Sequence, residues 1–457
     1  MSSDWKICTL GELGTIKTGK TPASSLGDGF GGTVPFVTPG DMNGQKWITD
    51  TDRCLNERGL ASVSSSLMPP RSVAVSCIGS DMGKASLLSR PSVTNQQINT
   101  IAVDESRFNA EFVYYDLSVR QQELKAAASG SATPILNKGH FSAIEISIPS
   151  RATQDKIAEI LGKLDDRIAV NRRINQTLEA MAQAIFQSWF VDFDPVKAKI
   201  AAKANGRDPL RAAMSAISGK TYAELDALPS EQYKQLAATA ALFPDEMEAS
   251  ELGGIPKGWA VCPLPECVGI NPARALKKGA VAPYLDMANV PTNAARVDNV
   301  ITRAFGSGSK FINGDTLLAR ITPCLENGKT AYVDFLADGE VGWGSTEFIV
   351  LRPKVGLPLP FAYFLCRHPE FRAFAISQMA GTSGRQRVPN DCFGSYKVVK
   401  PSVLIAEAFG KQTTQFMRQI KSLDEESKTL AGLRDALLPR LLSGELQVPH
   451  AEAEAVA

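Results

Sequence analysis

Residues 152–190 read ATQDKIAEILGKLDDRIAVNRRINQTLEAMAQAIFQSWF, and this stretch decides the fold. Its apolar residues follow at alternating steps of three and four, from Ile157 and Leu161 to Trp189, which is the spacing of a coiled-coil seam. A helix over this stretch is roughly 58 Å long at about 1.5 Å per residue, longer than a domain of about 150 residues is wide. The length favours a helix that pairs with another helix; the alternative is a helix that packs only on its own globular domain.

The same seam recurs 252 residues later, where Phe409 takes the place of Ile157. Because a whole domain separates the two helices in the sequence, we expect them to pair as an antiparallel coiled coil. Asn171 and Asn175 are polar seam positions, which cost stability but can fix register and orientation. The residues predicted to pair are Ile157, Leu161, Leu164, Ile168, Leu178, Ile185 and Trp189 in the first helix, and Phe409, Phe416, Ile420, Leu423, Leu430, Leu437 and Leu441 in the second.

The segments that precede the two helices also repeat. Trp5 recurs as Trp259, Pro35-Phe36-Val37 as Pro283-Tyr284-Leu285, and the segment 137–149 as 390–401, always in the same order and at offsets of about 245 to 254 residues. We therefore predict an α+β fold, with two globular mixed α/β domains in tandem repeat, each followed by a long helix. The predicted boundaries are a first domain at 1–150, a helix at 151–194, a linker at 195–255, a second domain at 256–402, a helix at 403–446 and a tail at 447–457.

The linker is rich in Ala and Lys and is interrupted by Gly and Pro. This composition predicts one or two short helices, one of them around residues 222–228.

Composition excludes several classes of protein. No apolar run approaches the roughly 18 residues of a membrane span, the N-terminus lacks the layout of a secretory signal, and the cysteines are scattered singly, so we expect a cytoplasmic protein without a membrane partner. The formal net charge of +1 is not that of a protein that coats DNA. If DNA is the ligand, positive charge must be concentrated locally or supplied by a partner.

The segment from Gly14 to Thr21, GTIKTGKT, matches a phosphate-binding loop, so a P-loop NTPase is one alternative. Such a loop needs a helix that starts at its Lys-Thr pair, and here Pro22 and several glycines follow instead. No metal site is predicted, because the three histidines are far apart and no Cys-x-x-Cys occurs, although Cys262 and Cys267 could approach each other. No catalytic residues are predicted.

Loops with chemistry suited to DNA occur at equivalent places in the two repeats. Residues 129–133, SGSAT, match residues 381–387, GTSGRQR. Small residues let the backbone approach phosphates, while Arg and Gln can read guanine and adenine. The predicted DNA-binding residues are Lys17, Lys20, Thr21, Lys84, Ser131, Thr133, Lys138, Arg274, Lys277, Lys278, Lys329, Thr382, Ser383, Arg385, Gln386 and Arg387.

Three further segments are AIFQSWFVDFDP at 184–195, SELGGIPKGW at 250–259 and LRDALLPRLLSGEL at 433–446. With the stretch 16–22, they make nearly the whole chain resemble a specificity subunit of a type I restriction-modification system. A coiled-coil adaptor that reads no bases is the other alternative.

The resemblance implies that two target recognition domains each read one half of a split, asymmetric sequence in double-stranded DNA. The paired helices then act as a ruler and as a dock for two methyltransferase subunits, and restriction subunits join to cleave unmodified DNA. S-adenosylmethionine and ATP belong to those partners, so this chain is expected to bind no cofactor and to be non-catalytic. Trp189 and Phe190 exceed what a two-helix contact needs, and we expect them to leave apolar surface for a partner. Target recognition domains vary greatly, so the family carries no base-reading residue onto this sequence.

Overall fold

The protein, described here by a computed structural model for residues 5–79, 81–128, 135–297, 299–382 and 384–448, forms two compact units. Unit 1 contains the chain up to Val170 and resumes at Ser427. Unit 2 is Asn171–Glu426. Each unit contains one globular domain and parts of both long helices.

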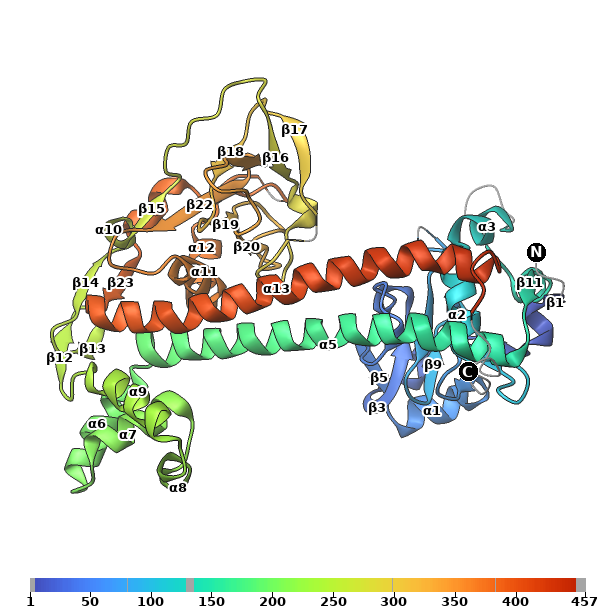
Figure 1. Cartoon of the computed structure of the whole chain (residues 1–457), viewed down its shortest axis with the longest axis horizontal. Coiled ribbons are helices and arrows are strands. Elements are labelled where there is room, and N and C mark those ends of the chain that lie inside the picture. The colour runs from blue at the N-terminus through green and yellow to red at the C-terminus, as the bar shows by residue number, and fades with distance from the viewer. Residues whose placement is uncertain (1–4, 80, 129–134, 298, 383, 449–457) are drawn as a thin grey trace, which may run out of the picture. The chain divides into compact units, whose positions relative to one another are not determined.

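The long helices are α5, Arg151–Phe190, and α13, Val403–Leu442, each of 40 residues (Figure 1). Residues 151–170 of α5 and residues 427–442 of α13 belong to unit 1, and the rest of each helix belongs to unit 2. None of the residues predicted to pair is exposed. Among the described residues, no helix is long and apolar enough to cross a membrane.

The helices pair antiparallel, as predicted. In unit 2 the side-chain amide of Asn171 donates a hydrogen bond to the carbonyl oxygen of Leu423 at 3.4 Å, and that of Asn175 donates to Ile420 at 3.3 Å. Positions therefore descend along α13 as they ascend along α5. The acceptors are backbone carbonyls, so the two Asn side chains tie the register of the helices to the main chain.

The domain of unit 1 contains three sheets, with the strand orders β1-β11, β2-β10-β7-β8-β4 and β5-β3-β9-β6. The strands are β1 Lys6–Thr9, β2 Gly14–Thr18, β3 Phe30–Val37, β4 Trp47–Ile48, β5 Arg53–Leu55, β6 Leu67–Met68, β7 Val73–Ser76, β8 Ala85–Leu88, β9 Ser92–Thr94, β10 Ile98–Val103 and β11 Glu145–Ile148. The short helices are α1 Glu57–Val63, α2 Ala110–Val119, α3 Gln121–Ala126 and α4 Lys138–Ser142.

The domain of unit 2 contains three sheets of the same kind, with the orders β14-β23, β15-β22-β19-β20 and β17-β16-β21-β18. The strands are β14 Ala260–Pro263, β15 Val268–Ile270, β16 Val281–Leu285, β17 Ile301–Ala304, β18 Ser309–Phe311, β19 Thr316–Ala319, β20 Thr330–Tyr332, β21 Gly342–Gly344, β22 Phe348–Pro353 and β23 Lys397–Lys400. The helices are α10 Leu264–Cys267, α11 Pro360–Arg367 and α12 Pro369–Ser377.

Strand pairing confirms that the two domains are repeats. In each domain, the strand that enters pairs antiparallel with the strand that leaves, β1 with β11 and β14 with β23. In each third sheet, one pair is parallel between two antiparallel pairs, β3 with β9 in unit 1 and β16 with β21 in unit 2. The predicted α+β tandem fold is therefore confirmed.

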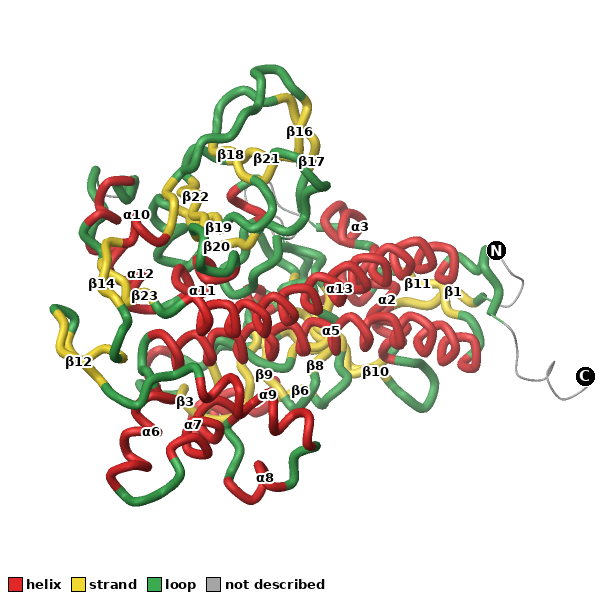
Figure 2. The backbone as a smooth tube through the Cα atoms, turned by 60° about the vertical axis from the view of Figure 1, so that its left-hand side comes forward, coloured by secondary structure: helices red, strands yellow, loops and turns green. Residues whose placement is uncertain are grey.

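The segment between α5 and the second domain contains four helices rather than the one or two expected (Figure 2). They are α6 Asp194–Ala204, α7 Pro209–Ser218, α8 Tyr222–Asp226 and α9 Ser230–Ala241, followed by the hairpin of β12 Met247–Ser250 and β13 Gly253–Pro256. The expected helix near residue 222 is α8. The prediction counted too few because tertiary packing stabilises these short helices: α7, α8 and α9 share a core around Ala213, Met214 and Leu225, and α6 packs into the core of unit 2 through Val196.

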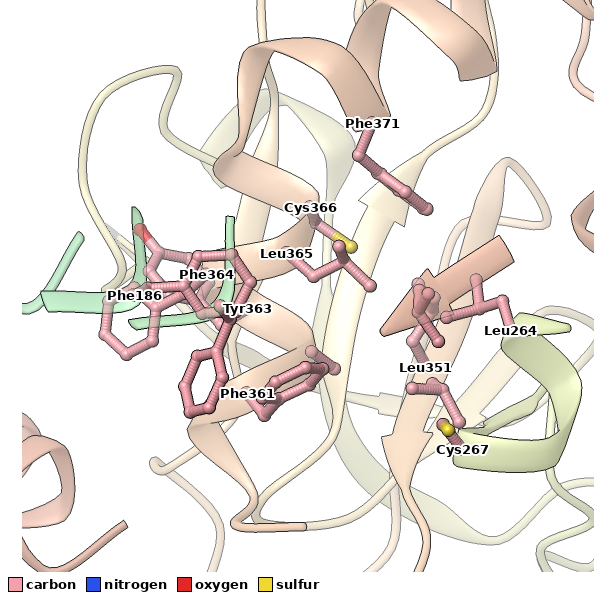
Figure 3. Close-up of a cluster of buried hydrophobic side chains, with 14 of the residues drawn as sticks. Phe186, Leu264, Cys267, Leu351, Phe361, Tyr363, Phe364, Leu365, Cys366 and Phe371 are labelled. Atoms are coloured by element: carbon pink, nitrogen blue, oxygen red, sulfur yellow. The ribbon is translucent and has the colours of Figure 1, made fainter. Parts of the chain in front are cut away.

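The second domain and α5 share one hydrophobic core (Figure 3). Phe186 of α5 packs edge-on against Phe361 of α11, with ring centroids 5.3 Å apart. In unit 1, Ile157 and Leu161 of α5 enter the core of the first domain in the same way. The seam residues therefore do what both sequence-based alternatives expected: they pack against a globular domain and also against the partner helix.

Trp189 and Phe190 lie inside the core of unit 2, only 1% and 6% exposed. Phe243 packs on Trp189 at 5.0 Å and Trp259 on Phe190 at 6.1 Å between ring centroids. The expectation that these two residues leave apolar surface for a partner is wrong, because the chain after α5 folds back over them.

Candidate nucleic-acid interface

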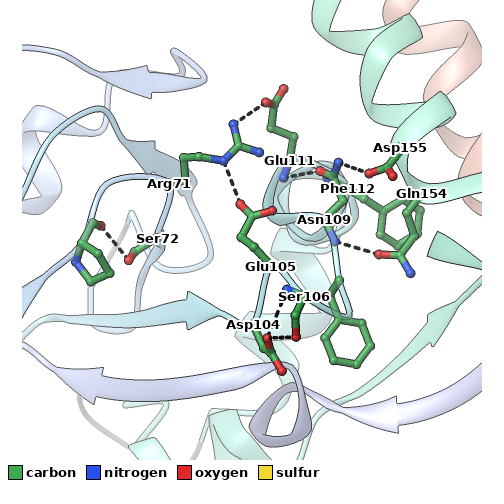
Figure 4. A network of polar contacts seen from close by, with 12 residues as sticks. Arg71, Ser72, Asp104, Glu105, Ser106, Asn109, Glu111, Phe112, Gln154 and Asp155 are labelled. Atoms are coloured by element: carbon green, nitrogen blue, oxygen red, sulfur yellow. Dashed lines mark hydrogen bonds and ion pairs between the residues drawn. The ribbon is translucent and has the colours of Figure 1, made fainter. Parts of the chain in front are cut away.

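A network of polar contacts attaches the first domain to the start of α5 (Figure 4). Asn109 donates a side-chain hydrogen bond to Asp155 at 2.7 Å, and its backbone N–H donates to Gln154 at 2.9 Å. Asn109 also caps α2, because its side-chain oxygen accepts from the backbone N–H groups of Glu111 and Phe112. One residue thus orders both α2 and its contact with the long helix.

Glu111 is the charged centre of this attachment. Lys46 donates to its carboxylate at 2.5 Å and Arg71 at 2.9 Å. Burial opposes ionisation, but the hydrogen bonds and charges of the two cations outweigh it and hold the pKa of Glu111 below its ordinary value. Arg71 reaches Glu111 from a backbone φ of 64°, in the left-handed region that few non-glycine residues adopt. Sequence reasoning missed this cluster because its members are far apart in the chain.

In unit 2, Glu179 of α5 has the equivalent task. Its carboxylate accepts hydrogen bonds from the hydroxyl of Tyr363 on α11 and, at 2.9 Å, from the backbone N–H of Ala295. Burial raises the pKa of Glu179 above its ordinary value, although the Tyr363 hydrogen bond acts against the shift. Arg296 donates to Asp424 of α13 at 2.9 Å. The second domain is therefore bound to both long helices.

Several predicted DNA-binding residues have partners within their own domain. Arg274 pairs with Asp315, whose side chain is fully buried and which also receives Arg352. Arg387 makes a bidentate pair with Glu347, in which Nη2 donates to Oε1 at 2.8 Å and Nε donates to Oε2 at 2.9 Å. Lesser contacts join Lys17 to the carbonyl of Leu67, Thr21 to Gln96, Lys84 to Asp81, and Lys329 to the carbonyl of Met287. Contact with DNA by Arg274 or Arg387 would require breaking an ion pair.

The remaining predicted residues divide into exposed ones and ones that the structure does not describe. Gln386 is held through its backbone by Thr322, at 3.1 Å in both directions. The exposed residues are Lys20, Lys138, Lys277, Lys278, Thr382 and Arg385. Ser131, Thr133 and Ser383 lie outside the described residues. Among the described residues, no hydrogen bond or ion pair joins these exposed side chains to one another, so they remain separate predictions.

The segment Gly14–Thr21 is not a phosphate-binding loop. Its first five residues form strand β2, and the first helical turn after them is a short one at Ser24–Leu26. A Cβ on Gly19 would come within 2.1 Å of the carbonyl oxygen of Thr94, so this glycine permits close packing of two backbones. The NTPase interpretation is wrong because the segment begins as a strand and, in the described part of the chain, no helix starts at its Lys-Thr pair.

Cys262 and Cys267 do approach each other, with their sulfur atoms 2.9 Å apart. Burial raises the pKa of Cys267 to about 12, which opposes formation of the thiolate that would bind metal or act as a nucleophile. In the described part of the chain, no group of three His, Cys, Asp or Glu residues could hold a metal ion.

Comparison with known proteins identifies the family. The family model described as type I restriction modification DNA specificity domain matches residues 2–180. Over 348 residues the chain is 32% identical to the type I restriction enzyme HindI specificity subunit of Haemophilus influenzae, covering 70% of this chain and 73% of that protein. This chain belongs to the type I specificity subunits.

More distant relatives extend the likeness to the full length of this specificity subunit. The MjaIX specificity subunit of Methanocaldococcus jannaschii is 23% identical over 464 residues, covering 97% of this chain and 94% of that one. The solved S subunit of a type I restriction-modification system from M. genitalium has a TM-score of 0.54 at 17% identity, and the match covers 96% of this chain and 97% of that one. At this identity the structural likeness supports the fold alone.

The specificity subunit carries two arginines that sequence reasoning missed. Arg53, on the edge strand β5, places its guanidinium over the rings of Phe30 and Phe36, 4.7 and 5.2 Å from their centroids. Phe36 stands directly opposite Arg53 on β3. The aromatic partners lie on another strand, so no local pattern around Arg53 could have found this contact.

The second arginine is Arg303, on the edge strand β17 of the other domain. Its guanidinium lies over Tyr284 and Trp343, 5.0 and 5.9 Å from the ring centroids. The indole N–H of Trp343 donates to the carbonyl oxygen of Arg303 at 3.3 Å, which also holds the backbone. Both Arg53 and Arg303 are exposed.

Proposed function

We propose that this specificity subunit recognises a split, asymmetric DNA sequence, with each domain reading one half. The observation that carries the proposal is that the two domains share one strand topology but have different side chains at equivalent positions. Trp343 on β21 faces Tyr284 on β16, whereas the equivalent strand β9 places Val93 opposite Phe36 on β3. Two domains of one strand topology but different side chains read two different half-sites, so the combined target is asymmetric.

The long helices are proposed to set the spacing between the half-sites. The first domain is attached to α5 at Asp165, which accepts a hydrogen bond from Tyr115 at 2.7 Å. The second is attached to the same helix at Glu179, through Tyr363. Because a helix advances about 1.5 Å per residue, the sequence separation of the two attachment points fixes their separation in space.

The catalytic work belongs to other subunits in this proposal. Two methyltransferase subunits, which bind S-adenosylmethionine and methylate adenine, dock on the paired helices, and restriction subunits that use ATP join them to cleave DNA. This chain binds neither cofactor. Its near-neutral net charge of +1 supports a division in which partners supply part of the positive charge that DNA binding requires.

The test is methylation-sensitive sequencing of host DNA from strains with and without this chain. We expect one split target to be methylated only when the chain is present. Replacing residues 1–150 with the equivalent domain of another specificity subunit should change one half of that target and leave the other half intact. A coiled-coil adaptor without base reading predicts the same methylated sites after the exchange.

A further inference from the structure

Two aromatic-backed arginines occupy corresponding edges of the two domains. In the sheet order β5-β3-β9-β6, Arg53 is on the first strand, and in β17-β16-β21-β18 Arg303 is on the first strand. Arg53 stands opposite Phe36, while Arg303 stands opposite Ala282, two residues from Tyr284. Side chains two residues apart on a strand lie on the same face of a sheet. Arg53 therefore lies on the sheet face that carries Phe36 of β3, and Arg303 lies on the face that carries Tyr284 of β16, the counterpart of Phe36.

These edges lie apart from the cores that hold the long helices. Around Arg53, the residues Phe36 and Leu55 belong to a small cluster without any residue of α5 or α13. Around Arg303, Phe305 and Trp343 form another such cluster. In Figure 1, β16 and β17 stand at the top of unit 2, on the side away from α13. Neither cluster that backs an arginine therefore takes part in holding its domain on the long helices.

Both side chains are held in place without an ion pair. Within the described residues, neither guanidinium has a carboxylate oxygen within 4.0 Å, unlike Arg274 and Arg387. Stacking on a ring orients the guanidinium plane and leaves its N–H groups available at the edge. A fixed Arg also loses less side-chain entropy on binding than a freely rotating one.

We propose that Arg53 and Arg303 are base-reading residues, each contacting a guanine in the half-site of its own domain. The planar fork of Arg matches the O6 and N7 acceptors of guanine in the major groove. β5 and β17 are the edge strands of their sheets, so the two guanidinium groups lie at a margin that the major groove of a duplex can approach. The inference rests on the proposed function, because it assigns residues to the recognition step.

The experiment uses the methyltransferase complex assembled with the full-length chain and DNA duplexes that carry the mapped target with one base pair changed at a time. In Arg303→Met, the apolar stem remains on Tyr284 and Trp343, so the hairpin keeps its packing while the hydrogen-bond donors are lost. We expect affinity for the intact target to fall about 5- to 100-fold and discrimination to vanish at one guanine-containing base pair of one half-site. Arg53→Met should do the same in the other half-site.

A charge-preserving variant separates base reading from attraction to phosphates. Arg303→Lys keeps the positive charge but lacks the fork, so it should lose discrimination at the same base pair as Arg303→Met. Wild-type affinity and base preference in Arg303→Lys, together with a loss of affinity in Arg303→Met that is uniform over all duplexes, would mean a phosphate contact and overturn the proposal. Unchanged base preferences in Arg303→Met, or altered preferences in both half-sites, would overturn it as well.

The matched control is Arg207→Met, at an exposed position after α6 among the linker helices, which should leave affinity and preferences unchanged. Melting curves of each variant check that the domain remains folded. If the wild-type complex shows no sequence preference, the proposed function itself fails. If the wild type discriminates and the Met variants do so equally, only the assignment of Arg53 and Arg303 fails.

Discussion

Asn171 donates its hydrogen bond to the carbonyl of Leu423, the residue that occupies its own position in the other repeat. Equivalent positions of two antiparallel helices meet only at a local two-fold axis. The helix pair is therefore centred at Asn171. Since its acceptor is a backbone carbonyl, any residue at position 423 can supply that acceptor.

This symmetry predicts that a fragment ending at Phe193 forms a homodimer through α5. In the full chain, Leu438 and Leu441 of α13 pack into the core of the first domain. In the homodimer, α5 of the second copy would take the place of α13 and put Phe186 and Trp189 at these two positions. Larger side chains in a packed core cost about 1–3 kcal/mol, so the dimer should be weak. Phe186→Leu combined with Trp189→Leu should tighten it by about tenfold or more, as measured by sedimentation equilibrium.

Such a dimer is symmetric, so its DNA target should be a palindrome built from the first half-site. Methylation mapping with the partner subunits checks this expectation. Recovery of the original asymmetric target from the fragment would contradict the assignment of one half-site to each domain.

A second prediction concerns the ruler. Inserting four residues after Asn175 lengthens α5 by about 6 Å and turns the remainder of the helix by about 40°. DNA rises about 3.4 Å per base pair, so the half-sites should separate by one or two base pairs with their bases unchanged. A matching insertion in α13 between Gln419 and Ile420, which faces Asn175, should keep the helices in register and bind more tightly than the single insertion. Methylation mapping that finds the original spacer in a fully active variant would show that the helices do not set the distance.

The buried carboxylate of Glu179 predicts a dependence of stability on pH. The pKa of Glu179 is raised in the folded protein, so the protonated side chain favours the folded state. This contribution to the free energy of unfolding is complete below the ordinary pKa of 4.5 and is lost as the pH rises through the raised pKa. Glu179→Gln stays neutral, and the hydroxyl of Tyr363 can accept from its amide while Ala295 donates to its oxygen. The variant should melt above the wild type at pH 8, and the difference should shrink towards pH 5.

The control for this comparison is Glu407→Gln, an exposed position on α13. It should leave the melting temperature unchanged at both pH values. A Glu179→Gln variant that melts below the wild type at pH 8 would mean that its hydrogen bonds outweigh the cost of burying the charge.

The loop at residues 385–387 gives a fourth prediction. Replacing Arg385, Gln386 and Arg387 together by alanine should impair recognition of the second half-site only. Arg387→Ala alone breaks an exposed ion pair with Glu347, and such pairs contribute little to stability, so it should leave base preferences intact. Footprints that show equal loss at both half-sites would indicate that the loop supports folding rather than recognition.

The helices could be predicted from sequence because their signal is local and periodic. Apolar residues recur along α5 at steps of three and four, interrupted only at Asn171 and Asn175, so the seam, its partner and the direction of pairing can be predicted from the residues themselves. The tandem domains were visible for a related reason, since repetition compares the chain with itself.

The candidate site could not be predicted to the same degree. Lys17 and Arg274 are basic in the sequence, but only the fold shows that a carbonyl and a buried carboxylate already bind them. Arg53 and Arg303 depend on rings brought by other strands, and strand pairing joins residues far apart in the chain. Charge can be read from one residue, whereas availability depends on its neighbours in space.

The pairing of β1 with β11, and of β14 with β23, means that the chain enters and leaves each domain at one place. Each domain is thus an insertion whose two ends are joined by one two-stranded sheet, which we call its stem: β1 with β11 in the first domain and β14 with β23 in the second. During evolution, recombination between genes can replace everything beyond the stem while the helices and their register stay as they were. A new DNA target can then arise in one genetic event, without any new arrangement for holding the complex together.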